Sequence, residues 1–202
     1  MCGKALPFRC ALSLQFAARL RFAEADEDVR VSTMNDRRIV IVGFMGCGKT
    51  TVAEALARRL SCEMIDLDSF ITEREGRSPA EIIQQDGEDA FRAIETHALQ
   101  KVVENNHARV IALGGGAWTI EANRTLADQH DCLSIWLDAS FEVCWARIMT
   151  GRQKTRPLAP DRENAHVLYN SRRTNYSRAD VRLAVEDGDS AEVLAEQILA
   201  RT

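Results

Sequence analysis

The sequence predicts an α/β protein with a five-stranded, mostly parallel sheet and helices on both of its faces. Short apolar runs alternate along the chain with longer segments in which apolar residues recur at helical spacing. The first apolar run, residues 38–42, leads into a glycine-rich loop and then into a helical pattern over residues 51–60. Strand, loop and helix in this order are typical of proteins whose parallel strands are buried on both sides. The 202 residues suffice for one such domain with a substantial core.

The remaining elements follow from apolar periodicity and turn residues. Short apolar runs predict further strands at residues 63–66, 110–113, 133–137 and 181–185. Helical spacing predicts helices at residues 68–75, 88–105, 141–149, 162–175 and 191–200. Ser78 and Pro79 are an N-cap residue and a first-turn proline, so another helix should begin there. Residues 150–163 are polar and basic and contain two prolines, which predicts a loop.

Composition narrows the class of partner. The formal net charge is −4, which disfavours general binding to nucleic acid or to a membrane surface. No run of 18 apolar residues predicts a transmembrane helix. The six cysteines form no C-x-x-C pair and indicate reduced thiols of a cytoplasmic protein. We therefore expect a small-molecule substrate, and we expect a monomer.

The first 35 residues differ from the rest. Residues 1–23 are basic and contain no acid, and an acidic patch follows at residues 24–28. Met34, just before the first strand, would be a natural start. We therefore predict a poorly structured extension over residues 1–35 and one domain over residues 36–202, with a processed transit segment as the less favoured alternative. Every motif described below lies after Met34, so removing residues 1–33 should leave activity intact.

The glycine-rich loop carries the strongest functional signal. Residues 43–50, GFMGCGKT, fit the phosphate-loop pattern G-x-x-x-x-G-K-[ST] at every fixed position. Glycines let backbone N–H groups converge on phosphate oxygens, and the following helix adds its N-terminal dipole. Lys49 is expected to reach the β- and γ-phosphates, and Thr50 to offer its hydroxyl to Mg²⁺. The predicted ATP-binding residues are Gly46, Cys47, Gly48, Lys49, Thr50 and Thr51.

Further polar and glycine residues follow the second and third predicted strands. Asp66 and Asp68 end the second strand, and three glycines, residues 114–116, end the third. Ligands of parallel sheets bind beyond the carboxyl ends of the strands, so these groups should meet the phosphate loop. An extended D-x-D segment would place both carboxylates on one side.

With these motifs the chain resembles the shikimate kinase family of phosphate-loop kinases. The matching motifs run in order through most of residues 38–186 and add F-R-x-x-E at residues 91–95 and T-R-P-L at residues 155–158. Arg172, four residues before Tyr176, completes the set. The resemblance implies the strand order 2-3-1-4-5 and a mobile lid at about residues 150–163. It also implies ATP- and Mg²⁺-dependent phosphorylation of shikimate to 3-phosphoshikimate, a step of aromatic amino-acid biosynthesis.

The resemblance also assigns roles to individual residues. Arg92 and Arg172 match the arginines that hold the shikimate carboxylate. Gly115 and Gly116 would let the substrate or the γ-phosphate approach the backbone closely. Asp68 matches the residue that binds the ring hydroxyls and takes the proton of the attacking one. Asp66 matches the acid that supports Mg²⁺, and Arg156 matches a lid arginine on the transferred phosphoryl group. Lys49, Asp68 and Arg156 are thus the predicted catalytic residues.

Other interpretations remain open. Asp66 and Asp68 could only cap a helix, and Arg92 could form a surface ion pair with Glu95. The triple glycine could be only a tight turn, Arg156 could belong to a solvated basic loop, and Arg173 could replace Arg172. At the level of function, the alternatives are a kinase of another small polyol or acid, a nucleoside monophosphate kinase, or an inactive nucleotide-binding regulator. No N-K-x-D guanine signature is present, which disfavours a GTPase.

Overall fold

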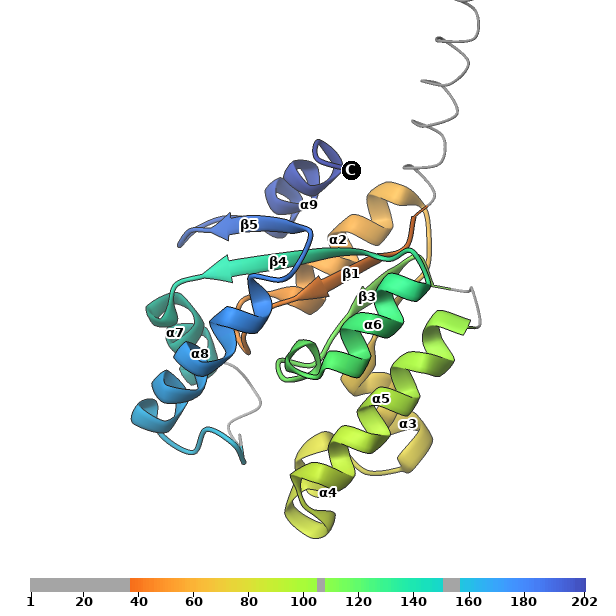
Figure 1. Ribbon diagram of the computed structural model, residues 1–202. Coiled ribbons are helices and arrows are strands. Elements are labelled where there is room, and N and C mark those ends of the chain that lie inside the picture. Colours follow the sequence, from red (N-terminus) through yellow and green to blue (C-terminus); the bar gives the residue numbers. More distant parts are fainter. Residues whose placement is uncertain (1–36, 105–107, 151–156) are drawn as a thin grey trace, which may run out of the picture. The chain divides into compact units, whose positions relative to one another are not determined.

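The sheet has the strand order that the sequence resemblance implies. In the computed structural model, which describes residues 37–104, 108–150 and 157–202, the five strands pair in the order β2-β3-β1-β4-β5 and are all parallel (Figure 1). The strands are β1 (Ile39–Val42), β2 (Met64–Asp66), β3 (Val110–Ala112), β4 (Leu133–Ala139) and β5 (Val181–Val185). The predicted α/β class and strand order are confirmed. All carboxyl ends therefore meet at one edge of the sheet.

Helices cover both faces of this sheet. On one face α2 (Lys49–Leu60) packs against α9 (Ala191–Leu199), and on the other lie α5 (Glu88–Glu104), α6 (Glu121–Gln129) and α8 (Arg162–Tyr176) (Figure 1). The helices near the carboxyl edge are α3 (Leu67–Glu75), α4 (Pro79–Asp86) and α7 (Phe141–Thr150), with a 3₁₀ turn at Ala117–Thr119. As predicted, Ser78 caps α4, and a capping box with Glu81 completes the start of this helix.

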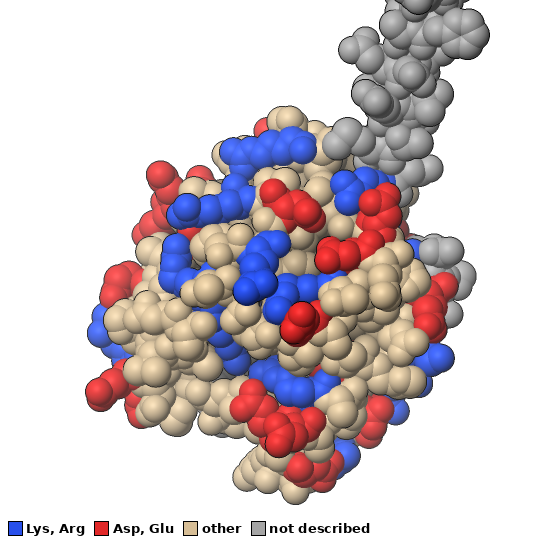
Figure 2. Space-filling view, in the orientation of Figure 1, with Lys and Arg blue, Asp and Glu red and all other residues tan. Residues whose placement is uncertain are grey.

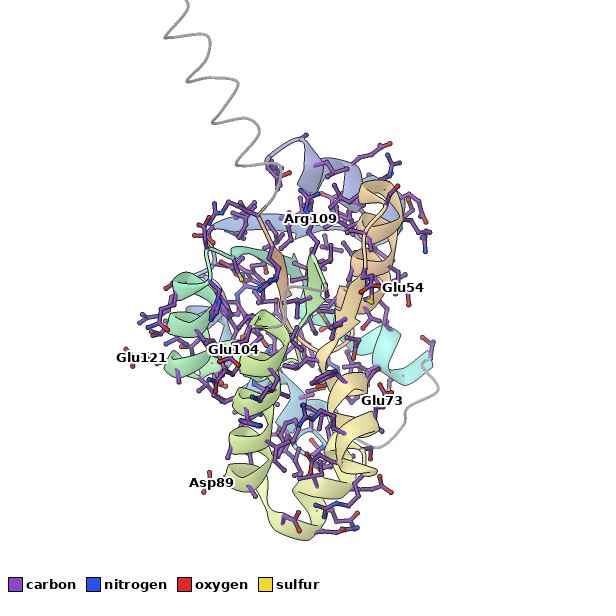
Figure 3. All side chains as sticks on the ribbon, turned by 90° about the vertical axis from the view of Figure 1, so that its right-hand side faces the viewer. Glu54, Glu73, Asp89, Glu104, Arg109 and Glu121 are labelled. Atoms are coloured by element: carbon purple, nitrogen blue, oxygen red, sulfur yellow. The ribbon has the colours of Figure 1, made fainter. Side chains whose placement is uncertain are left out.

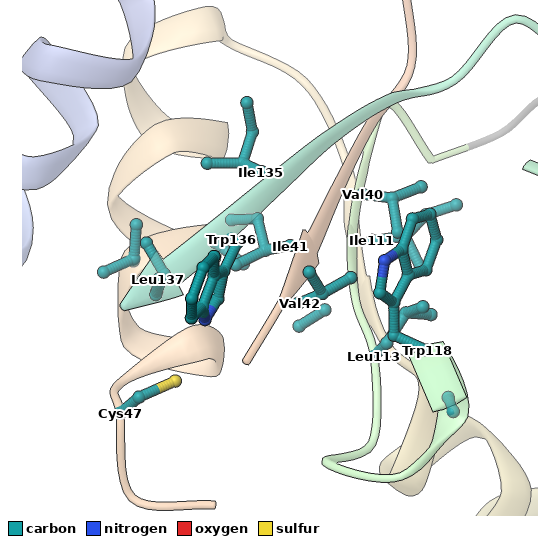
Figure 4. Packing of buried hydrophobic residues seen from close by; sticks show 14 of the residues in the cluster. Val40, Ile41, Val42, Cys47, Ile111, Leu113, Trp118, Ile135, Trp136 and Leu137 are labelled. Carbon is teal, nitrogen blue, oxygen red and sulfur yellow. The ribbon is translucent and has the colours of Figure 1, made fainter. Parts of the chain in front are cut away.

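The core lies on both sides of the central strands. Every residue of β1 and β3 is buried, and Figure 4 shows their side chains packed with those of β4. Trp118 and Trp136 are part of this core, whereas Trp145 is only partly buried against it. The acidic side chains labelled in Figure 3, such as Glu54 on α2 and Glu104 on α5, lie on exposed helix surfaces. On the face shown in Figure 2, basic and acidic side chains are interspersed.

Two local predictions were wrong. Helix α6 was not predicted, because it begins after Ile120 without a side-chain cap and ends at His130 without a glycine. The D-x-D segment is not extended throughout, because α3 already begins at Leu67. Asp66 therefore ends a strand while Asp68 lies in the first helical turn, and the alternation rule for strands does not relate their side chains.

Residues 37–202 form one compact unit. The predicted extension and its boundary near residue 35 fall on residues outside the described ranges, so they stay predictions. The same holds for residues 151–156 of the predicted lid, which are not among those described. Within the described ranges, no helix has both the length and the apolar character needed to cross a membrane.

Candidate active site

A cleft of about 1000 Å³ lies at the carboxyl edge of the sheet and brings together most of the predicted site residues. Those that line it are Gly46, Gly48, Lys49, Thr50, Thr51, Asp66, Asp68, Arg92, Gly115, Gly116 and Arg172. Two predicted residues are not among them. Cys47 is buried, and its sulfur points toward the side chains of the core (Figure 4). Arg156 lies outside the described residues.

The phosphate loop has the backbone that its glycines permit. Gly46 and Gly48 have φ values of 79° and 101°, in the left-handed region that residues with a Cβ rarely adopt. At Gly46 a Cβ would also lie 2.5 Å from the Cys144 carbonyl oxygen. The Lys49 ammonium donates a hydrogen bond of 3.0 Å to the Phe44 carbonyl, which keeps the charge at the loop. Helix α2 begins at Lys49, so its first N–H groups and its dipole face the same space.

Asp66 connects the phosphate loop to the next strand. Its Oδ2 accepts a hydrogen bond of 2.6 Å from the Thr50 hydroxyl, and its Oδ1 accepts one of 3.0 Å from the Ser69 N–H. The capping interpretation of Asp66 is thus correct, and the same carboxylate also faces the phosphate loop. A threonine hydroxyl and a carboxylate side by side at the phosphate loop form a donor set that suits Mg²⁺.

The ion pair between Arg92 and Glu95 is not on the surface. Arg92 Nη1 lies 2.7 Å from Glu95 Oε2, and its Nη2 lies 2.9 Å from Glu88 Oε1. The Arg92 side chain is only 16% exposed and that of Glu95 is 0% exposed. A Cβ on Gly116 would collide with the Arg92 guanidinium, so any side chain there would displace this arginine. The triple glycine is therefore more than a tight turn.

Glu95 and Asp68 face the same point across Gly114. A Cβ on Gly114 would lie 2.6 Å from Glu95 Oε1 and 2.7 Å from Asp68 Oδ1. Glu95 Oε1 is buried and has no hydrogen-bond partner among the described residues. Burial raises the pKa of Glu95 to about 7; the charge of Arg92 opposes this shift, and that of Asp68 adds to it. Glu95 Oε1 thus leaves acceptor capacity beside the cleft.

The adjacent arginines of α8 point to different places. Arg172 lines the cleft, is 6% exposed and forms no ion pair with any described residue. Burial lowers the pKa of Arg172, and the nearby charge of Arg92 lowers it further. Arg173 instead pairs with Asp138 at 2.6 Å and packs over Trp136 and Tyr169. The cleft-facing arginine is therefore Arg172.

Comparisons with known proteins identify the family. The family model for shikimate kinase matches residues 45–202. A shikimate kinase of Ruegeria pomeroyi is 37% identical, with 81% of this chain and 84% of that protein covered. One of Cereibacter sphaeroides is 36% identical over 93% and 92% of the two chains. The solved structure of the Acinetobacter baumannii shikimate kinase in complex with shikimate is 33% identical, with a TM-score of 0.75 over 82% of this chain and 92% of that one.

This chain belongs to the shikimate kinase family. It is an ATP-dependent phosphotransferase. Residues of the phosphate loop, the D-x-D segment, the F-R-x-x-E motif and the triple glycine line its cleft. The roles of the individual residues remain predictions, and they are argued below from the positions of the side chains.

This family member also places residues at the cleft that the motifs did not indicate. Arg147, in the last turn of α7, lines the cleft and donates from Nη1 to the Cys47 carbonyl at 3.4 Å. It adds a second cation beside Lys49 at the phosphate loop. A single arginine at the end of a predicted helix carries no signal in the sequence, because only the packing of α7 against the loop brings it there.

Two further residues brace the turn after the glycines. Asn123 is buried and donates to the Ala117 carbonyl at 2.9 Å, and Arg124 donates to the Trp118 carbonyl at 2.7 Å. Both come from α6. The helix that the sequence did not predict thus holds the segment that follows Gly116, and its Asn-Arg pair is one of the motifs that carry the resemblance to shikimate kinases.

Proposed function

We propose that this protein transfers the γ-phosphoryl group of ATP to a hydroxyl of shikimate and releases 3-phosphoshikimate. The observation that carries the proposal is Arg172, a guanidinium that is 6% exposed, lines the cleft and has no ion-pair partner among the described residues. A buried charge without a partner is costly, and an anionic ligand in the cleft would offset this cost. Arg92 lies in the same cleft, so a carboxylate would meet two guanidinium groups.

The rest of the cleft supplies what a cyclic polyol needs. Asp68 lines the same cleft, where its carboxylate would accept the proton of the attacking hydroxyl. Gly115 and Gly116 would allow the acceptor to approach the backbone. Lys49 and Arg147 would balance the charge that develops on the transferred phosphoryl group, and Arg156 would add to them.

Mg²⁺ belongs to the same proposal. The Thr50 hydroxyl and the Asp66 carboxylate would hold it, directly or through water, because Mg²⁺ typically takes one or two protein oxygens plus phosphate oxygens. When bound, the ion would neutralise charge on the β- and γ-phosphates. A cytoplasmic location and a monomeric state remain part of the proposal. The four described cysteines, Cys47, Cys62, Cys132 and Cys144, are free thiols and support the first of these.

A coupled assay of ADP release across several acceptors tests the substrate. Shikimate should be used well, whereas its neutral amide, other small polyols and nucleoside monophosphates should be poor acceptors. Arg172→Met should lower kcat/KM for shikimate by roughly 30-fold or more, since a buried charge pair loses one partner at a cost of about 2–5 kcal/mol. The same substitution should add little further loss with the amide. Equal use of shikimate and its amide by the wild-type protein would contradict the proposal.

A further inference from the structure

The hydroxyl of Tyr176 lies beside two groups that would hold the acceptor, the Gly115 backbone and the Arg172 side chain. Tyr176 ends α8, is 1% exposed, and donates a hydrogen bond to the Gly115 carbonyl. Arg172, one helical turn earlier, is close enough to the same hydroxyl for hydrogen bonding. A tyrosine hydroxyl can donate one hydrogen bond and accept others, so it can serve both groups at once. Burial raises the pKa of Tyr176, which keeps its proton in place.

The hydrogen bond to Gly115 sets the direction of the next N–H group. The chain contains no cis peptide bond among its described residues, and in a trans peptide the C=O of one residue points opposite to the N–H of the next. The Gly115 carbonyl points at the buried Tyr176 hydroxyl, so the Gly116 N–H points away from this hydroxyl, and both glycines line the cleft. No described residue accepts a hydrogen bond from this N–H.

We infer that Tyr176 is a positioning residue, whose hydroxyl fixes both the Arg172 guanidinium and the Gly115–Gly116 peptide in the orientation that receives the acceptor. The inference rests on the proposed function in so far as the acceptor is shikimate. Tyr176 itself touches no substrate, because its ring is buried behind the glycines. It acts through one side chain and one peptide group that both line the cleft.

Helix α8 provides a matched control for this arrangement. Tyr169, two turns earlier, donates to the Ala139 carbonyl at 2.9 Å, and its hydroxyl accepts from Arg173 at 2.6 Å. The arrangement is similar, because in both places a buried hydroxyl donates to a carbonyl and lies beside an arginine of the same helix. Neither Tyr169 nor Arg173 lines the cleft. Tyr169→Phe should therefore reproduce the structural cost of losing such a hydroxyl without its effect on the acceptor.

The first experiment compares the two phenylalanine variants in steady-state kinetics and thermal unfolding. Tyr176→Phe should lower kcat/KM for shikimate by about tenfold, mostly through KM, while the KM for ATP stays within about twofold. Tyr169→Phe should lose a similar amount of thermal stability but keep both KM values. The inference is overturned if Tyr176→Phe leaves kcat/KM for shikimate unchanged, or if the two variants lose it equally.

A second measurement uses the wild-type protein and so does not depend on the folding of a variant. In ¹⁵N–¹H spectra, the Gly116 amide and the Arg172 side-chain resonances should both move when shikimate is added to the protein. Movement of Arg172 without Gly116 would overturn the inference and leave the proposed function standing. If no resonance moves and no turnover is found, the proposed function fails. Testing the same two resonances in ligand-free Tyr176→Phe, where both should shift, then decides the inference alone.

Discussion

Two carboxylates of this protein are almost completely buried beside arginines, yet their surroundings differ. Asp138, at the end of β4, is 6% exposed, and both of its oxygens accept from Arg173, while Oδ2 also pairs with Arg182. Glu95, on α5, is 0% exposed and uses Oε2 for Arg92, but its Oε1 has no partner among the described residues. Both oxygens of Asp138 therefore have hydrogen-bond partners within the protein. Glu95 Oε1 remains able to accept a hydrogen bond from a ligand.

The difference separates a structural ion pair from one that serves a binding site. A buried charge with all of its hydrogen bonds satisfied holds elements together, here β4, α8 and β5. A buried pair that is incompletely satisfied costs stability, and a protein keeps it where a ligand completes it. The Arg92–Glu95 pair lies in the cleft and the Arg173–Asp138 pair does not, as this distinction requires.

The largest expected effect follows from removing the cleft arginine. Arg92→Ala should lower kcat/KM for shikimate by roughly 30- to 3000-fold, since losing one partner of a buried, hydrogen-bonded charge pair costs about 2–5 kcal/mol. Arg92→Lys should recover only part of this, because an ammonium group lacks the planar fork. ATP affinity should hardly change. A coupled kinetic assay measures all three, and impaired ATP binding in Arg92→Ala would place this arginine on the nucleotide side instead.

The second prediction uses the raised pKa of Glu95, about 7 in the folded protein. Arg92, Asp68 and Arg172 all act on this carboxyl group, and burial outweighs them. The folded protein therefore binds a proton that the unfolded chain, with a pKa near 4.3, has already lost. Ionisation of Glu95 therefore lowers the free energy of unfolding as pH rises from about 4.5 to about 7. The whole loss of stability is present above pH 7.

Glu95→Gln removes that titration. The difference in free energy of unfolding between the variant and wild type should shift by about 2–3 kcal/mol in favour of the variant as pH rises from about 5 to about 8. One pKa unit corresponds to about 1.4 kcal/mol. Urea unfolding at several pH values measures the difference. Glu88→Gln changes the other, half-exposed partner of Arg92 and should keep the shape of the wild-type curve. A Glu95→Gln curve parallel to that of wild type would mean that Glu95 stays ionised and that the contrast with Asp138 is smaller than described.

The sequence allowed the fold and the site to be predicted wherever the determinants are local. The phosphate loop and the start of α4 are set by glycines, a cap and a proline within a few residues. By contrast, α6 lacks such signals, and Cys47 turned inward because the packing of β4 and α7 decides which side of the loop faces the core. The buried state of Glu95 likewise depends on segments far away in the sequence.

The choice between Arg172 and Arg173 shows the same limit, although the spacing to Tyr176 already favoured Arg172. Neighbouring residues of a helix differ in direction by about 100°, and the sequence alone does not say which direction faces the cleft. Each arginine, however, lies four residues from a tyrosine, Arg172 from Tyr176 and Arg173 from Tyr169, which is the spacing of side chains that touch on a helix. Because Tyr176 also contacts the glycine loop, this pair is the one at the site.

The smallest expected effect on catalysis concerns the Arg173–Asp138 pair, in which both carboxylate oxygens have partners within the protein. Arg173→Ala removes the fork on Asp138 and the packing over Trp136, but Asp138 keeps Arg182. The free energy of unfolding should fall by about 1.5–3 kcal/mol, as for other hydrogen bonds to a charged group. Below the unfolding transition, kcat/KM for shikimate should change by less than about threefold, since a positioned Arg172 does not require its neighbour.

Arg182→Ala is the control for this last experiment, because Arg182 contacts the same oxygen but is 64% exposed. Its loss should cost at most about 1 kcal/mol, the usual range for an exposed ion pair. Urea unfolding and the coupled kinetic assay on the same preparations measure both quantities. If Arg173→Ala lowered kcat/KM for shikimate as strongly as Arg92→Ala, the Asp138 pair would also serve the site, and saturation by the protein's own groups would no longer distinguish a structural carboxylate from one that a ligand completes.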